Sequence, residues 1–283
     1  MPQLAPFVFV LLWSTGFIGA KLGLPYAGPL TFLSIRFICV IVLLTLLATV
    51  MRRPWPGGQR TWLHLAVAGV LLHAGYLSGV FCSIGAGLSA GQVALIVGLQ
   101  PVLTAILGAP LLGERLGGRQ WLGLACGFVG VALVVGDRLG QAATLPALGL
   151  AGLGLAGITL GTLYQKRFVP SFDLWTGSAV QFAAALAVIG PLAWWLEPAG
   201  VAWTPSFLFA LGWLTLVLSI GAISLLHLLI RRGEATRVSA LFYLTPPTTA
   251  LMAWIIFDER LAAGALVGMA VCVFGVWLVI GRR

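Results

Sequence analysis

Ten long apolar segments occupy most of this 283-residue chain. A helix needs about 20 mostly apolar residues to cross the hydrocarbon core of a bilayer, and each segment is close to that length. Only 8% of the residues are charged, whereas a soluble domain usually carries about 25%. The sequence therefore predicts an all-α integral membrane protein with ten transmembrane helices. The expected spans are 5–22, 30–51, 62–84, 90–112, 119–136, 146–166, 174–195, 204–230, 236–257 and 262–280.

The basic residues predict the orientation of these spans. If the N-terminus is cytoplasmic, twelve of the 16 Lys and Arg residues fall on the cytoplasmic side and three outside. Short cytoplasmic loops carry such an excess, so we expect both termini in the cytoplasm of a multi-pass protein of the bacterial inner membrane. The same loops account for the net charge of +9. No basic stripe forms on one element, which argues against a nucleic-acid partner.

The chain repeats itself at an offset of 145 residues. Residues 90–138 align with 235–283 without a gap, at 17 identities in 49 positions. This divides the protein into two units, 1–138 and 146–283, with five spans each. Because five is odd, the second unit must be inserted upside down, and inverted repeats are typical of secondary transporters. A duplicated scaffold without transport is the alternative.

Several motifs resemble one transporter family. Trp13-Ser14-Thr15-Gly16-Phe17, then Lys21, then Arg36-Phe37 resemble the opening of EamA-type proteins of the drug/metabolite transporter superfamily. The stretches ending Glu114-Arg115-Leu116 and Glu259-Arg260-Leu261 resemble the duplicated signature of that family. The resemblance implies ten helices, a central cavity between the halves, and transport of metabolites such as amino acids without ATP. Within the superfamily, the chain is most similar to aromatic amino-acid exporters of the YddG type.

Polar and aromatic residues inside the spans are candidates for substrate binding, because such groups are costly in a membrane. Arg36, about two turns inside its span, is either a counter-charge for a substrate carboxylate or a packing arginine. His73 and Tyr76 are three residues apart and share a helix face. The ring of Trp13 either stacks on a substrate or is a lipid-facing or core residue. The full set of predicted binding residues is Trp13, Arg36, His73, Tyr76, Gln100, Tyr243 and Thr245.

Two prolines and two lysines are candidate gating residues. Pro101 and Pro246 are expected mid-helix in spans 90–112 and 236–257, where a proline removes one backbone hydrogen bond. Each kink either gates transport or is a static packing feature. Lys21 and Lys166, which match at the offset of 145, either attract an anionic group at opposite ends or lie in the interface.

The remaining residue types narrow the function. The four cysteines lie in apolar segments without metal-ligand spacing, so we expect no cofactor and no metal. All seven acidic residues fall at helix ends or in loops, which favours a carrier driven by the gradient of its substrate, with coupling through a histidine as the fallback. The glycine pairs Gly123/Gly127 and Gly264/Gly268 indicate either helix packing or a homodimer contact.

These features predict an alternating-access carrier that moves a small molecule across the inner membrane. The expected substrates are amino acids, aromatic or large neutral, with export one of the expected directions. Another metabolite or a drug is the alternative substrate. An integral-membrane enzyme is less favoured because no cluster of catalytic groups is evident. An ion channel would typically need a ring of polar residues.

Overall fold

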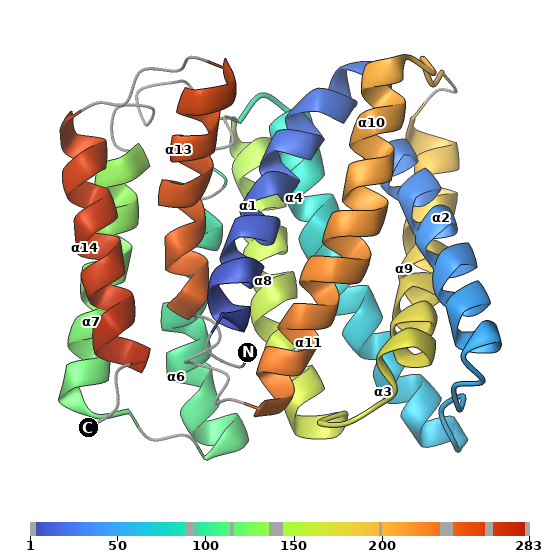
Figure 1. The fold of residues 1–283 in the computed structure, drawn as a ribbon, viewed down its shortest axis with the longest axis horizontal. Coiled ribbons are helices and arrows are strands. Elements are labelled where there is room, and N and C mark those ends of the chain that lie inside the picture. The colour runs from blue at the N-terminus through green and yellow to red at the C-terminus, as the bar shows by residue number, and fades with distance from the viewer. Residues whose placement is uncertain are drawn as a thin grey trace.

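The computed structural model describes residues 4–88, 93, 96–113, 116–135, 144–197, 200–232, 240–257 and 263–280. These residues are helical almost throughout and contain no strand. The helices stand side by side in one bundle (Figure 1). Their bounds are α1 Ala5–Gly23, η1 Leu24–Tyr26, α2 Pro29–Val50, α3 Gln59–Gly69, η2 Val70–Gly75, α4 Tyr76–Gly85, α6 Gln100–Leu112, α7 Gly118–Val135, α8 Leu145–Phe168, α9 Leu174–Leu196, α10 Pro205–Trp213, η4 Leu214–Ala222, α11 Ile223–Arg232, η5 Leu241–Leu244, α13 Thr245–Phe257 and α14 Ala263–Ile280.

Six helical stretches of the described residues are long and apolar enough to cross a bilayer. They coincide with six of the ten predicted spans. The other four predicted spans fall partly outside the described residues. There α7 and α14 have 18 residues each, and α6 and α13 have 13 each. The all-helical membrane fold is thus confirmed, while the count of ten stays a prediction. The six stretches are 5–26, 29–50, 59–85, 145–168, 174–196 and 205–226.

Helix bounds repeat with the sequence. Adding 145 to the bounds of α6 and α7 gives those of α13 and α14, that is, 100–112 becomes 245–257 and 118–135 becomes 263–280. The π-helical η2 maps to 215–220, inside the π-helical η4. The second copies run in the opposite direction: α6 ends at the end of the bundle where α14 also ends, and α13 ends at the other (Figure 1).

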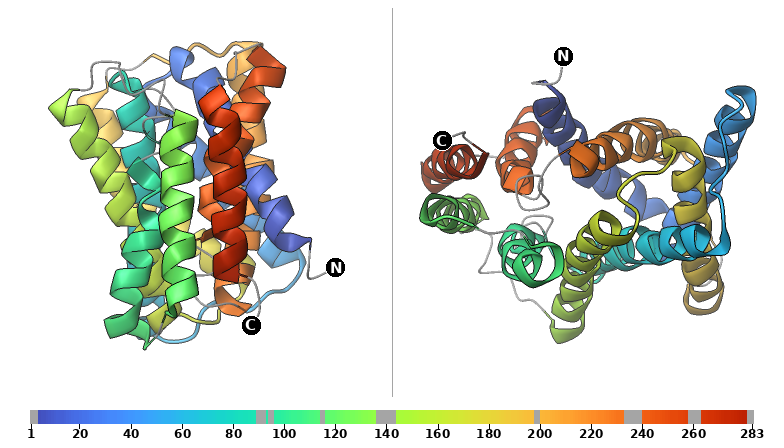
Figure 2. Two further views of the ribbon diagram at one scale, coloured as in Figure 1. Left: turned by 90° about the vertical axis from the view of Figure 1, so that its left-hand side faces the viewer. Right: turned by 90° about the horizontal axis from the view of Figure 1, so that it is seen from below.

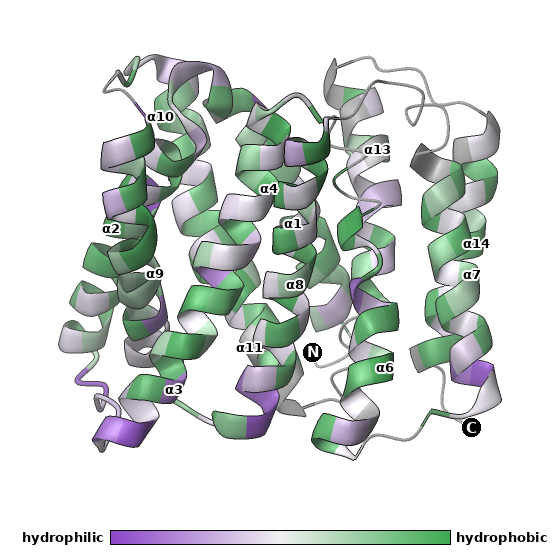
Figure 3. Ribbon diagram, turned by 180° about the vertical axis from the view of Figure 1, so that it is seen from behind, coloured by the Kyte–Doolittle hydropathy of each residue, from purple (hydrophilic) through white to green (hydrophobic). Residues whose placement is uncertain are grey.

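Polar residues gather at one end of this bundle. The most hydrophilic ribbon lies where α2 and α8 end and α3 begins, whereas the helix shafts are mostly apolar (Figure 3). Arg52 and Arg53 lie just beyond Met51, the C-cap of α2, and Lys166 and Arg167 lie in the last turn of α8. We call this the arginine-rich end.

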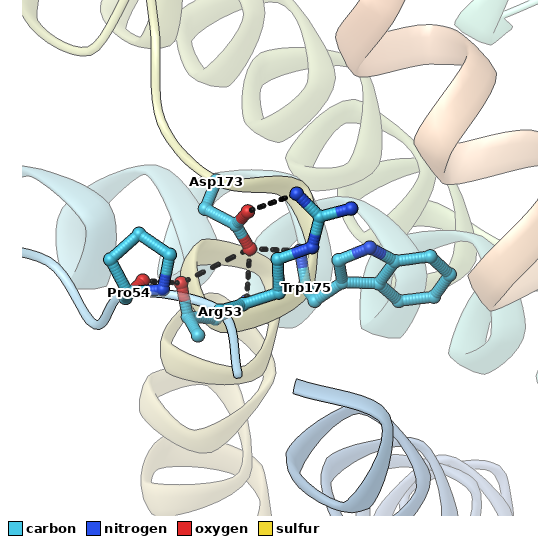
Figure 4. Close-up of polar contacts among 5 residues, drawn as sticks. Arg53, Pro54, Asp173 and Trp175 are labelled. Atoms are coloured by element: carbon cyan, nitrogen blue, oxygen red, sulfur yellow. Dashed lines mark hydrogen bonds and ion pairs between the residues drawn. The ribbon is translucent and has the colours of Figure 1, made fainter. Parts of the chain in front are cut away.

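α2 and α9 are antiparallel and joined at the arginine-rich end by Asp173. This residue is the N-cap of α9, where its Oδ1 accepts backbone N–H groups of Trp175 at 3.0 Å and Thr176 at 3.2 Å. Its Oδ2 lies 4.0 Å from Nη1 of Arg53 (Figure 4). The Thr176 hydroxyl donates to the carbonyl of Pro54 at 2.9 Å. The side chain that caps α9 thus also ties it to the segment after α2.

Glu197 makes the corresponding connection at the opposite end of the same pair. It follows α9, and its carboxylate accepts the N–H groups of Leu30 at 2.9 Å and Thr31 at 2.7 Å. These N–H groups lie in the first turn of α2, where no intrahelical acceptor exists. An anion is also favoured there by the helix dipole. The pair is therefore tied at both ends.

The two predicted kink prolines begin helices rather than bend them. Pro101 is the second residue of α6, and Pro246 is the second residue of α13. Residues 98–99 form a turn and η5 is a 3₁₀ helix, so each span is interrupted just before its proline. The predicted mid-helix position is wrong, because the first helical turn suits a residue without an N–H.

Three of the four predicted small residues, Gly123, Gly127 and Gly268, contribute to the contact between α7 and α14, which lie side by side (Figure 2). A Cβ on Gly123 would lie 2.7 Å from the carbonyl oxygen of Gly275, and one on Gly130 2.8 Å from that of Gly268. Only glycine permits such close backbone approach. Gly123 and Gly268 therefore serve packing within the chain, whereas the homodimer contact stays a prediction.

Candidate functional site

A small cavity brings three of the predicted binding residues together. Its walls come from α1, α2, α4, η4 and α11, and its volume is about 30 Å³. A second cavity of about 10 Å³ shares the rings of Trp13 and Tyr76 with the first and adds His73. Four of the seven predicted residues thus meet in one region. The first cavity is lined by Trp13, Gly16, Phe17, Ala20, Arg36, Tyr76, Leu77, Val80, Phe81, Leu218 and Ile223.

Aromatic rings form one side of this region. Trp13 of α1 stacks with Tyr76, the first residue of α4, at a centroid distance of 6.1 Å and an interplanar angle of 9°. Phe242 of η5 meets the Trp13 ring edge-on at 5.2 Å, and Phe9 packs on both. Sequence reasoning found Trp13 and Tyr76 but missed Phe9 and Phe242. Phenylalanines in apolar helices carry no local signal that separates them from ordinary core residues.

Arg36 is the largest fully buried side chain among the described residues. Its Nε donates to the hydroxyl of Ser219 on η4 at 3.0 Å. Its Nη1 and Nη2 have no hydrogen-bond partner in the described part of the chain. The two acidic residues that the structure describes, Asp173 and Glu197, lie at the two ends of α9 and hold backbone N–H groups there. A buried charge is costly unless it is paired, and the Nη1–Nη2 edge is unpaired among the described residues, which makes Arg36 a candidate for binding an anion.

Sequence reasoning also missed Ser219, the partner of Arg36. The only signal available is a hydroxyl residue in a strongly apolar segment, Leu214–Ala222. Serine in a membrane helix can bond to its own backbone, so that signal alone does not distinguish Ser219 from other serines. The contact depends on η4 packing beside α2, which the sequence does not show.

His73 lies in η2 and is 2% exposed. Its ring stacks on Phe182 of α9 at 4.1 Å with an interplanar angle of 9°. Phe37 of α2 lies 6.3 Å away in a T-shaped arrangement. The imidazole thus packs on two aromatic rings and is a wall residue of the second cavity.

The other three predicted binding residues line neither cavity. Gln100 and Thr245 are the first residues of α6 and α13, and both are buried. The carbonyl of Thr245 accepts the Ser14 hydroxyl at 3.4 Å. Tyr243 of η5 is fully buried against Gly127 of α7, where a Cβ would collide with the phenol ring. These residues occupy contacts between helices outside the cavity walls.

Lys21 and Lys166 lie in the last turns of α1 and α8, at opposite ends of the bundle. This matches their predicted placement.

A broad concavity of about 720 Å³ lies near the end of the bundle at which α1 ends. It is lined by residues 24–29, Gly85 and 200–202. Its walls are mostly backbone, proline and small apolar residues, without a charged side chain. We therefore place the site in the small aromatic cavity with Arg36.

Apolar helices around a buried, partly basic cavity define a multi-pass membrane protein. The chain belongs to the EamA-like transporter family, whose profile matches residues 3–136 and again 145–281. This confirms the family resemblance of the motifs, and it establishes the protein as a membrane transporter. The profile matches twice, once in each half of the chain.

Individual proteins are similar over nearly the whole length. The chain is 26% identical to a protein of Escherichia coli K12 named "Probable amino-acid metabolite efflux pump", covering 97% of this chain and 93% of that one. It is 27% identical to the "Uncharacterized transporter YvbV" of Bacillus subtilis 168, covering 95% and 88%. A solved structure titled "Crystal structure of protein" aligns with a TM-score of 0.78 at 21% identity, covering 97% and 94%. This last likeness shows the fold alone.

Proposed function

We propose that this transporter is an alternating-access carrier of amino acids with aromatic or large neutral side chains. The observation that carries the proposal is that the Arg36 guanidinium and the Trp13–Tyr76 stack share the walls of one cavity. A guanidinium binds a carboxylate through two parallel hydrogen bonds, and aromatic rings stack on an aromatic side chain. An amphipathic zwitterion offers both groups.

The size of the cavity supports a mechanism in which helices move. A volume of about 30 Å³ holds about two water molecules, since each needs at least about 10–15 Å³ of such volume. An amino acid needs several times that volume, so α1, α2, α4 and η4 must separate to admit it. Similarity to a protein named as an amino-acid metabolite efflux pump also favours this substrate class and export as a direction.

The architecture that we propose is ten helices in two inverted halves, 1–138 and 146–283. Its support is the repetition of helix bounds at the offset of 145 and the opposite direction of the second copies. Basic loops predominate on the cytoplasmic side of inner-membrane proteins. On that rule the arginine-rich end faces the cytoplasm, as do both termini. Inverted halves can then expose one central site to each side in turn.

The driving force that we propose is the gradient of the substrate itself. The acidic residues that the structure describes, Asp173 and Glu197, bind helix termini rather than lining the cavity. His73 lines the second cavity. In a proton-coupled mechanism, this histidine would carry the proton.

Counterflow in proteoliposomes tests the proposal. Liposomes are preloaded with unlabelled tryptophan, and entry of labelled tryptophan is followed without an ion gradient. We expect uptake above that of empty liposomes, reduced in Arg36→Gln and Tyr76→Ala. Ser83→Ala is the matched control, because this buried serine of α4 lines neither cavity. If the folded wild type takes up no amino acid, the substrate class is wrong, and other metabolites and drugs become the substrates to test.

A further inference from the structure

We propose that Ser219 is a positioning residue that sets which edge of the Arg36 guanidinium faces the substrate. The inference rests on the proposed function, in which Arg36 binds the substrate carboxylate. It goes further by assigning a role to a residue of η4 and by predicting the geometry of carboxylate recognition.

The hydrogen bonds of Ser219 fix the direction of its contact with Arg36. Its hydroxyl donates to the carbonyl of Leu214 at 3.0 Å, five residues earlier in the chain. A hydroxyl has one proton and two acceptor lone pairs. Because the hydroxyl proton is donated to the Leu214 carbonyl, only a lone pair of the Ser219 oxygen faces α2. That lone pair accepts the Nε–H of Arg36 at 3.0 Å.

The π-helical form of η4 creates this arrangement. A π-helix is rare, occurs as single turns within α-helices, and is frequent at functional sites. Here the Ser219 hydroxyl bonds the carbonyl of residue i−5, and its other contact lies on a different helix. Ser219 is 1% exposed, so water does not compete for either bond. The serine is therefore a rigid acceptor.

Comparison of the two halves shows that the pair has no counterpart at the symmetry-related positions. At the offset of 145, Arg36 matches Gln181, and Ser219 matches Ala74. Gln181 instead donates to Gln165 on α8 at 2.9 Å. The arginine of the first half and its serine acceptor in the second half thus form a contact between the halves, and the symmetry-related positions hold neither residue type. The pair belongs to an asymmetric site rather than to the repeated scaffold.

The consequence for recognition follows from the shape of the guanidinium. It carries five N–H donors in a planar fork. Since Ser219 occupies the Nε–H, the edge formed by Nη1 and Nη2 remains, and neither nitrogen has a partner among the described residues. A carboxylate binds that edge end-on through two parallel hydrogen bonds. A neutral carboxamide cannot accept both bonds equally, so the site selects the carboxylate.

Competition against tryptophan counterflow tests this role. The competitors are L-tryptophan and L-tryptophanamide, which differ only in the carboxylate. In Ser219→Ala we expect the inhibition constant of tryptophan to rise about tenfold. The guanidinium of Arg36 would no longer be held in place, and an effect of this size corresponds to the loss of one of its charge-assisted hydrogen bonds to the carboxylate. That of tryptophanamide should change less than about twofold, since it depends little on that bond. Ser219→Cys, which keeps the shape but offers a weak acceptor, should resemble Ser219→Ala, whereas Ser219→Thr should retain the preference.

Ser83→Ala is the control for removal of a buried hydroxyl. Ser83 donates to the carbonyl of Val80 at 2.8 Å in α4, and its loss should leave the ratio of the two constants unchanged. An unchanged ratio in folded Ser219→Ala or Ser219→Cys would overturn the role of Ser219, and so would an equal rise in both constants. In either case tryptophan transport by the wild type would leave the proposed function standing. A wild type that transports no amino acid would instead contradict the proposed function itself.

Discussion

The indole of Trp13 and the phenol of Tyr76 lie nearly parallel, with ring centroids 6.1 Å apart and planes at 9°. The two residues come from α1 and from the first position of α4, just after the π-helical η2. Both rings face the cavity that Arg36 also lines. The stack therefore supplies an aromatic part of the cavity wall to which Arg36 also contributes.

Truncation of this stack should weaken aromatic substrates selectively. For Tyr76→Ala we expect the inhibition constant of tryptophan to rise about tenfold, the effect of losing an aromatic pair of about 1.4 kcal/mol. Alanine as a competitor should be affected less, because its side chain reaches no ring. Tyr76→Phe keeps the ring and should keep the preference. If Tyr76→Phe is as impaired as Tyr76→Ala, the hydroxyl rather than the ring makes the contribution.

Replacement of Arg36 should separate stability from transport. Its charge is fully buried and has one hydrogen bond among the described residues. Replacing a buried charge by a neutral side chain of similar size is often neutral or stabilising. We expect Arg36→Gln to melt at or above the temperature of the wild type while losing tryptophan counterflow. Arg36→Lys keeps the charge without the fork and should lose most of the affinity. A strongly destabilised Arg36→Gln would indicate a structural role instead.

The contact between Glu197 and the start of α2 should contribute to stability. Its carboxylate holds the N–H groups of Leu30 and Thr31, and hydrogen bonds to a charged group contribute about 1.5–3 kcal/mol. We expect Glu197→Ala to lower the melting temperature in detergent, with Glu197→Gln intermediate.

A second variant checks the same contact from the other side. A Cβ on Gly28 would collide with the Glu197 carboxylate, so Gly28→Ala should displace it and destabilise to a similar extent. The double variant Gly28→Ala with Glu197→Ala should then be little worse than either single one, since both remove the same bonds. Additive losses would show that the two residues act independently.

Much of the fold could be predicted because membrane helices can be recognised in a sequence by their length and apolar composition. The meeting of Trp13, Arg36 and Tyr76 was also predictable, since polar and bulky aromatic groups inside apolar spans tend to face the bundle interior. In contrast, the sequence did not allow us to predict that α6 and α13 begin one residue before Pro101 and Pro246. The turn at 98–99 and the 3₁₀ turn η5 interrupt runs whose composition stays apolar throughout.

Residues placed by tertiary contacts also escaped prediction. Ser219 acquires its role because η4 packs beside α2. The direction of Tyr243 depends on η5, where the 3₁₀ form shifts side chains away from the α-helical phase. Phe242, one residue earlier, therefore meets Trp13, while Tyr243 meets Gly127 of α7. Helical periodicity alone cannot tell which of these two adjacent rings faces the cavity.

Tyr243→Phe distinguishes binding from packing at this last position. The phenol is fully buried, and its hydroxyl has no hydrogen-bond partner among the described residues. A buried hydroxyl without a partner costs about 1–3 kcal/mol in protein mutants, so removing it should leave the melting temperature unchanged or raise it. Because Tyr243 lines neither cavity, the inhibition constant of tryptophan should stay within about twofold of the wild type, well under the tenfold effect of 1.4 kcal/mol. Gly127→Ala, which forces the ring to move, should destabilise the protein without changing the preference for the carboxylate. A loss of affinity in folded Tyr243→Phe would instead show that the hydroxyl reaches the substrate when the helices separate.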